Sequence, residues 1–243
     1  MGRRQVLAAL VVIVVCSITG VASSAQVSDR DLQVNVEQKL RGAPLIGQRV
    51  ISIEVRDGVV TLYGGVETLY EEWSAVDHAG DVRGVRSVES RLDIIYKSAQ
   101  SDDSIAMTIQ RRFSMVPALE SENIEVAVEG GKVRLGGFVK QAQDRTTAVD
   151  EAAMIRGVTA VEMAIDTPAQ EDAEIATAAK YLLNPKRSSA GVRGSFDVAV
   201  KDGVVTLTGR VARPYYRKQA ERAILAVNGV RRVENQLEVR PGS

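Results

Sequence analysis

Histidine and cysteine are almost absent from this chain of 243 residues, which contains one of each. Most zinc, iron and copper sites are built from these two residue types, so the sequence has almost no material for such a site. Cys16 lies in an apolar leader, which leaves the rest of the chain without a cysteine nucleophile or a disulfide. This scarcity argues against most classes of enzyme.

An excess of charge is also missing, since 31 Lys and Arg residues balance 31 Asp and Glu residues. A neutral chain is not typical of a strongly basic nucleic-acid-binding protein. Hydrophobic residues at 45% and charged residues at 26% are ordinary for a globular protein and exclude collagen-like or wholly disordered chains. No nucleophile elbow, P-loop or His-Glu-x-x-His motif occurs. We therefore expect no enzyme activity, no cofactor, no metal site and no nucleic-acid partner.

Residues 1–25 have the layout of a signal peptide: a basic start at Arg3 and Arg4, an apolar run, and small residues ending at Ala25. We predict that the protein is exported to the periplasm and that its signal peptide is cleaved after Ala25. The alternative is an uncleaved membrane anchor, because residues 6–22 are just long enough for a tilted span. Cys16 lacks the small preceding residue expected for lipidation, and the export route stays open.

The rest of the chain contains one unit three times, at residues 28–97, 101–166 and 171–240. The run Asp-Gly-Val-Val-Thr-Leu at 57–62 returns at 202–207 and, more loosely, at 130–135. In each copy one glycine follows the turn glycine after six residues and another after twenty-six residues. These structural glycines are Gly58, Gly64 and Gly84, then Gly131, Gly137 and Gly157, then Gly203, Gly209 and Gly229.

Each copy predicts the element order α-β-β-α-β. The first helix is indicated by an apolar series at every fourth residue, such as Leu32, Val36 and Leu40. Strict apolar alternation over residues 51–55 is typical of a half-buried strand. A returning strand, a second helix rich in alanine and a last alternating strand follow. The fold class is therefore α+β, with three tandem small αββαβ domains, each a three-stranded sheet with two helices on one face.

Two local signals support these element positions. Acidic residues lie at or near helix starts, where carboxylates suit the free N–H groups and the positive end of the dipole; they are Asp102, Asp103, Glu171 and Asp172. The Asp-Gly pairs at 57–58 and 202–203 favour type I′ hairpin turns, in which both central residues need positive φ. A place in such a turn explains Asp57 and Asp202 without any catalytic role.

The third copy carries the clearest family signature: residues 202–209, then Asn-Gly-Val at 228–230 and Val-Glu-Asn-Gln-Leu at 233–237. With these motifs the chain resembles the BON domain family, and the second copy is the most divergent. The resemblance implies non-catalytic modules of exported or envelope proteins, associated with osmotic-stress protection, envelope maintenance and binding to phospholipid surfaces. It implies no catalytic residues, and the family glycine corresponds to Gly64, Gly137 and Gly209.

The copies differ in charge. Their formal balances are −3 for residues 26–97, −4 for residues 101–166 and +5 for residues 171–240. In the third copy, basic side chains gather around the start of the second helix with two tyrosines among them. The group is Arg210, Arg213, Tyr215, Tyr216, Arg217, Lys218 and Arg222. Near an anionic membrane surface each Lys or Arg contributes roughly 1 kcal/mol. This group is therefore a candidate site for anionic phospholipid.

Other interpretations of these side chains remain open. The basic domain equally suits an acidic domain, within the chain or between chains, and the protein is then an adaptor or scaffold that binds envelope proteins or itself. The same side chains are also compatible with a solvated helix face and packed tyrosines. We expect Trp73 to be a partly buried packing residue and His78 to be a solvated surface residue.

Overall fold

The computed structural model describes residues 27–95, 100–120, 122–184 and 192–240. The predicted signal peptide, with Cys16, and most of the segment that joins the first two copies lie outside these ranges. Among the described residues, no helix has both the length and the apolar character needed to cross a membrane.

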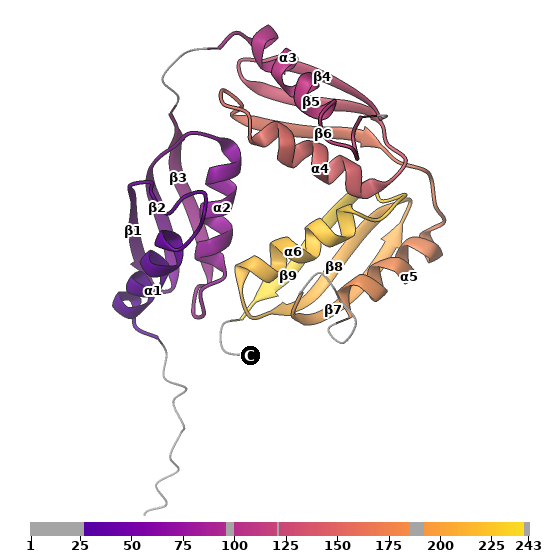
Figure 1. The fold of residues 1–243 in the computed structure, drawn as a ribbon. Coiled ribbons are helices and arrows are strands. Elements are labelled where there is room, and N and C mark those ends of the chain that lie inside the picture. The colour runs from indigo at the N-terminus through magenta and orange to yellow at the C-terminus, as the bar shows by residue number, and fades with distance from the viewer. Residues whose placement is uncertain (1–26, 96–99, 121, 185–191, 241–243) are drawn as a thin grey trace, which may run out of the picture.

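The predicted fold class is confirmed, because each copy folds as its own domain with a separate three-stranded sheet (Figure 1). Domain 1 contains α1 (Asp29–Arg41), β1 (Ile51–Arg56), β2 (Val59–Val66), α2 (Leu69–Gly80) and β3 (Ser87–Ile94). Domain 2 contains α3 (Asp102–Phe113), β4 (Asn123–Glu129), β5 (Lys132–Phe138), α4 (Ala142–Ala153) and β6 (Ala160–Asp166). Domain 3 contains α5 (Asp172–Leu183), β7 (Gly194–Lys201), β8 (Val204–Val211), α6 (Pro214–Leu225) and β9 (Arg232–Val239).

Every sheet has the same topology. The first two strands form an antiparallel hairpin, and the third strand pairs parallel to the second after the crossover through the second helix. In domain 1 the apolar stripe of α1, Leu32, Val36 and Leu40, is at most 4% exposed. It packs with Ala75 and Ala79 of α2 against the inner face of the sheet. Both helices of the domain therefore cover one face.

The hairpin turns have the predicted geometry, with φ of 50° at Asp57 and 76° at Gly58, and similar positive values in the other two domains. An aspartate at the start of the first helix holds each turn. In domain 3, Asp172 accepts hydrogen bonds from the N–H groups of Asp202 and Gly203 at 2.8 and 2.9 Å. Asp29 and Asp102 do the same in their domains. These carboxylates thus join helix and hairpin, a role beyond the predicted interaction with the helix dipole.

The family glycine is required by the backbone. Gly209 has φ of +129°, and a Cβ built there would lie 2.0 Å from the carbonyl oxygen of Ser195 on the paired strand. Gly64 and Gly137 share the positive φ and the close carbonyl. No other residue type fits there without displacing the neighbouring strand.

The three domains pack around their second helices (Figure 1). α2, α4 and α6 face inward and contact one another, whereas α1, α3 and α5 lie on the outside. We call this meeting point of α2, α4 and α6 the helix junction.

Candidate functional site: the helix junction

Domains 2 and 3 are joined by a bidentate ion pair. Arg222 of α6 donates from Nη1 and Nη2 to the two carboxylate oxygens of Asp150 on α4, at 2.9 and 2.5 Å. Both side chains are half-buried, and the hydrogen bond with Asp150 raises the pKa of Arg222. Asp77 occupies the same position in domain 1 as Asp150 does in domain 2. Corresponding helix positions thus carry opposite charges in the domains that meet.

Domains 1 and 3 are joined in the same way. Arg213 Nη1 donates to Oδ1 of Asp81 at 2.7 Å and to its main-chain oxygen at 2.9 Å. Lys218 Nζ lies 2.9 Å from Oδ1 of Asp77. Asp81 also pairs with Lys39 of its own domain at 2.9 Å. Burial acts to raise the pKa of Asp81, but the hydrogen bonds from Lys39 and Arg213 outweigh it and lower that pKa.

Aromatic side chains lie beside these ion pairs. The Lys218 ammonium lies 5.8 Å from the centre of the Trp73 ring, within cation–π range. Tyr215 is half-buried. Its pKa is raised mainly by burial and, to a smaller extent, by the negative charges of Asp81 and Asp77. Trp73 packs against the core of domain 2, so it is the partly buried packing residue expected from the sequence.

Domain 1 also contributes directly to the core of domain 2. Leu69, the first residue of α2, is 6% exposed and belongs to the apolar cluster of domain 2 rather than to that of its own domain. Tyr70 and Trp73 pack against the same cluster. Arg156 of domain 2 forms an ion pair with Glu67 of domain 1 beside this contact. Apolar packing and charge pairing therefore act together at this interface.

Arg145 of α4 is 2% exposed and is buried between domains 2 and 3. Its Nε donates to the carbonyl oxygen of Leu225 at 3.0 Å, and its Nη1 donates to that of Val230 at 2.8 Å. Leu225 is the last residue of α6, so the Arg145 cation also interacts favourably with the negative end of the dipole of that helix. Burial lowers the pKa of Arg145. Arg145 was not among the residues predicted from the sequence, although an arginine within the alanine stripe of α4 was a signal.

The structure separates the seven candidate lipid-binding residues into groups. Arg213, Tyr215, Lys218 and Arg222 meet at the helix junction and contact domains 1 and 2. Tyr216 lies beside them, with its ring 5.7 Å from that of Tyr215 and 5.6 Å from the Arg213 guanidinium. Arg210 and Arg217 stay exposed, and Arg217 donates to the carbonyl oxygen of Asn235. The group is not one continuous exposed face, and its lipid-binding role stays a prediction.

Two hollows lie near the helix junction. A polar hollow of about 440 Å³ lies between α2 and α6 and has His78 and Asp77 in its wall. His78 is half-buried, and its Nδ1 hydrogen-bonds the carbonyl oxygen of Ser74 at 2.7 Å.

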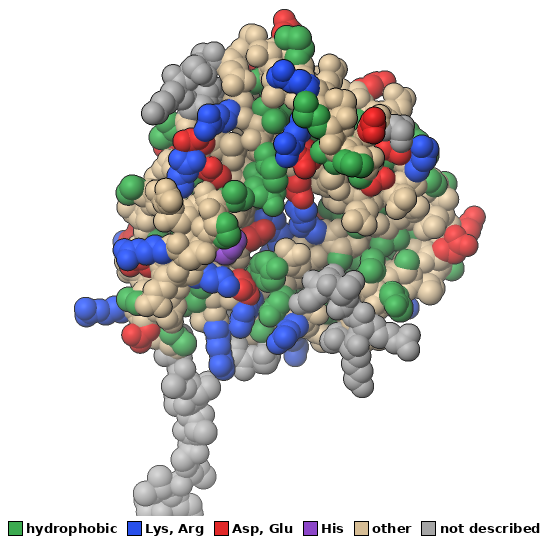
Figure 2. Space-filling model, viewed as in Figure 1, with side chains coloured by type: hydrophobic (Ala, Val, Ile, Leu, Met, Phe, Trp, Pro, Cys, Tyr) green, Lys and Arg blue, Asp and Glu red, His purple; other side chains and the backbone are tan. Residues whose placement is uncertain are grey.

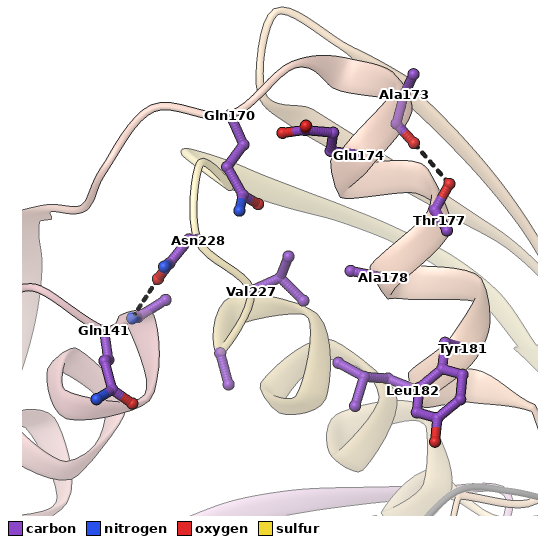
Figure 3. A pocket seen from close by; sticks show the side chains of 12 residues that line it. Gln141, Gln170, Ala173, Glu174, Thr177, Ala178, Tyr181, Leu182, Val227 and Asn228 are labelled. Atoms are coloured by element: carbon purple, nitrogen blue, oxygen red, sulfur yellow. Dashed lines mark hydrogen bonds between the residues drawn. The ribbon is translucent and has the colours of Figure 1, made fainter.

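A groove of about 820 Å³ beside α5 has a mainly apolar wall, in which Ala178, Leu182 and Val227 face one another (Figure 3). Within the described ranges, no three His, Cys, Asp or Glu side chains are grouped to hold a metal ion.

Comparison with known proteins gives a family match over most of the chain. The model of the BON domain family matches residues 28–96, 101–168 and 172–241, which confirms the resemblance seen in the sequence. No curated protein matches.

Solved structures give weak likenesses. The C-terminal domain of CdsD, a structural protein of the type III secretion system of Chlamydia trachomatis, is 15% identical with a TM-score of 0.24, covering 88% of this chain and 100% of that one. The PrgH periplasmic domain is 11% identical with a TM-score of 0.21, covering 78% of this chain and 95% of that one. These scores are too low to support an argument about shared arrangement or function.

Proposed function

This chain belongs to the BON domain family, and on that premise we propose that it is an exported, non-catalytic protein of the cell envelope that acts as a preassembled three-domain scaffold. One observation carries the proposal. Arg213, Lys218 and Arg222, the cations that made domain 3 a candidate membrane-binding domain, pair with aspartates of domains 1 and 2. The opposite charges of the domains then hold the domains together.

The contacts are of a kind that holds domains together. A single exposed ion pair contributes about 0–1 kcal/mol, but these pairs are partly shielded and act together with the apolar packing of Leu69. The buried Arg145 adds charge-assisted hydrogen bonds to backbone carbonyls, which are stronger than neutral ones. Together they favour one fixed arrangement, so partner proteins of the envelope meet a constant outer surface made by the three domains.

Binding to anionic phospholipid is the second candidate function, with a role in envelope maintenance or osmotic-stress protection. The family resemblance and the exposure of Arg210 and Arg217 favour it. In this case the isolated domain 3 binds vesicles more strongly than the whole chain, because separation from domains 1 and 2 frees Arg213, Lys218 and Arg222.

The scaffold is tested by reversing one charge and then restoring the pair. In the chain without its leader, Arg222→Asp places two carboxylates together, and we expect small-angle X-ray scattering to show a larger radius of gyration. The double variant Arg222→Asp with Asp150→Arg should return the radius to the wild-type value. An unchanged radius in the single variant would show that this pair does not hold the domains together.

Vesicle flotation of the same chain separates the two functions. A scaffold that uses its cations internally should not float with vesicles of phosphatidylglycerol and phosphatidylcholine. Flotation of the wild-type chain that is lost in Arg210→Glu with Arg217→Glu would favour the phospholipid function.

A further inference from the structure

A cleft of about 580 Å³ lies between domains 1 and 3, next to the helix junction. Four arginines from both domains line it: Arg83 from the loop after α2, Arg193 from the segment before β7, Arg210 from β8 and Arg213 from the start of α6. We call it the arginine cleft. On the face drawn in Figure 2, Lys and Arg side chains gather along the seam between these two domains.

The arginine cleft has more positive charge than its surroundings neutralise. Among its described lining residues there is no Asp or Glu. Arg213 is paired with Asp81, whereas Arg210 is 62% exposed and lies 3.9 Å from Glu238, at the limit of an ion pair. Arg83 and Arg193 have no ion pair and no side-chain hydrogen bond with any described residue. The cleft is therefore left with two cations that no described carboxylate neutralises.

The lining also supplies the hydrogen-bond donors that an oxyanion needs. Guanidinium groups are planar forks of N–H donors that match the oxygens of phosphate groups. The hydroxyl groups of Ser195 and Tyr216 belong to the same wall. A phosphate monoester carries a charge of about −1.5 to −2 at neutral pH, and in its dianionic form a phosphate group balances the two unpaired arginines.

We propose that the arginine cleft binds a phosphate dianion, either free phosphate or a phosphomonoester headgroup, between domain 1 and domain 3. This goes beyond the proposed scaffold but requires its arrangement of domains, because Arg83 and Arg193 come from different domains. A ligand that binds only this arrangement of the domains stabilises it by a free energy that grows with the logarithm of the ligand concentration over its dissociation constant. Phosphate then acts as a clamp between the first and last domains.

Isothermal titration calorimetry with inorganic phosphate tests the site, at constant ionic strength set with chloride. We expect the double variant Arg83→Gln with Arg193→Gln to bind phosphate at least ten-fold more weakly than the wild-type chain. Arg111→Gln is the matched control, since Arg111 is an exposed arginine of α3 in domain 2, far from the cleft in sequence. It should bind phosphate as the wild type does. Equal binding by the double variant would overturn the proposal, and so would a wild-type chain that neither binds millimolar phosphate nor floats with phosphatidate vesicles.

Thermal melting and scattering keep the site and the scaffold distinguishable. Phosphate should raise the melting temperature of the wild type and of Arg111→Gln, but not that of the double variant. Both substituted arginines are exposed, so the double variant should keep the wild-type radius of gyration if the scaffold is correct. Loss of phosphate binding with an unchanged radius supports the site, whereas retained binding contradicts it whatever the radius.

Two arms distinguish the source of the phosphate group. Flotation with phosphatidate vesicles that is lost in the double variant indicates a lipid headgroup. Calorimetric binding of phosphate without flotation indicates a soluble ligand. Failure of both in the wild-type chain would refute the proposed site.

Discussion

Arg145 of domain 2 donates through Nε to the carbonyl oxygen of Leu225, at the end of α6 in domain 3. The side chain is buried, yet among the described residues no carboxylate forms an ion pair with it. The positive charge is instead compensated by carbonyl dipoles at a helix C-terminus. Domain 3 therefore completes the hydrogen bonding of a residue that belongs to domain 2.

Replacement of Arg145 should separate domains 2 and 3. In Arg145→Met the carbonyl groups of Leu225 and Val230 lose their donors, which costs roughly 1–3 kcal/mol for a buried unsatisfied group. Arg145→Lys should rescue little, because one ammonium cannot reproduce the fork that reaches both carbonyls. Chemical denaturation and hydrogen exchange at Leu225 and Val230 measure the effect. Wild-type stability of Arg145→Met would contradict this role.

Acid should open the contact between domains 1 and 3. The pKa of Asp81 is lowered in the folded arrangement, so its contribution is fully present above the ordinary aspartate value of about 3.9. It is lost as the pH falls through the lowered pKa, where Asp81 is protonated and its pairs with Arg213 and Lys39 weaken. Scattering between pH 7 and pH 2 should show expansion at the acid end.

Asp81→Asn is the control for this pH dependence. The amide cannot titrate, so the variant should show a weaker contact at neutral pH and a smaller change on acidification. An identical pH profile in wild type and Asp81→Asn would assign the transition to other groups.

The family glycine should tolerate no side chain. Gly209→Val combines a positive φ with a clash against the Ser195 carbonyl, and we expect domain 3 to lose roughly 1–3 kcal/mol or more of stability from the strained backbone alone. Domain 2 offers a matched pair, because Gly137 has φ of +100° whereas a Cβ at Gly136 would meet only Glu125, at 3.8 Å. Gly137→Ala should lower the melting temperature far more than Gly136→Ala. Similar melting of the two variants would exclude the backbone explanation.

Asp172, which joins helix and hairpin, should contribute more to the stability of domain 3 than its acidic neighbour Glu171. Asp172→Ala leaves the N–H groups of Asp202 and Gly203 without their acceptor, at a cost of about 1–3 kcal/mol. Glu171→Ala is the control, because the Glu171 side chain makes no capping hydrogen bond. Faster hydrogen exchange at Asp202 and Gly203 in the first variant only is the expected result. Equal hydrogen exchange in the two variants would show that both residues act only through the helix dipole.

The elements of each domain were predictable from the sequence because their causes are local. The Asp-Gly pair at 57–58 requires positive φ whatever surrounds it, and the series Leu32, Val36 and Leu40 makes a helix amphipathic on its own. The repetition of both signals in each copy also predicted one fold three times.

The candidate site was predicted only in part. The sequence showed that cations gather at the start of the last domain's second helix, and Arg213, Lys218 and Arg222 do meet at one place. It did not show what neutralises them, because an anionic lipid and an aspartate present the same charge. The alanine stripe around Arg145 marked its position as buried, but its partners could not be predicted, because backbone carbonyls carry no sequence signal.

The sequence by itself determined the three domains, their hairpins and the glycines that their backbones require, because turn geometry and amphipathic periodicity act within a few residues. Only the tertiary structure decided that α2, α4 and α6 meet, that Asp150 is the partner of Arg222, and that Arg83 and Arg193 line one cleft. Those pairings join residues far apart in the chain. Ionic attraction and burial depend on where side chains lie in space, and packing of whole domains sets that position.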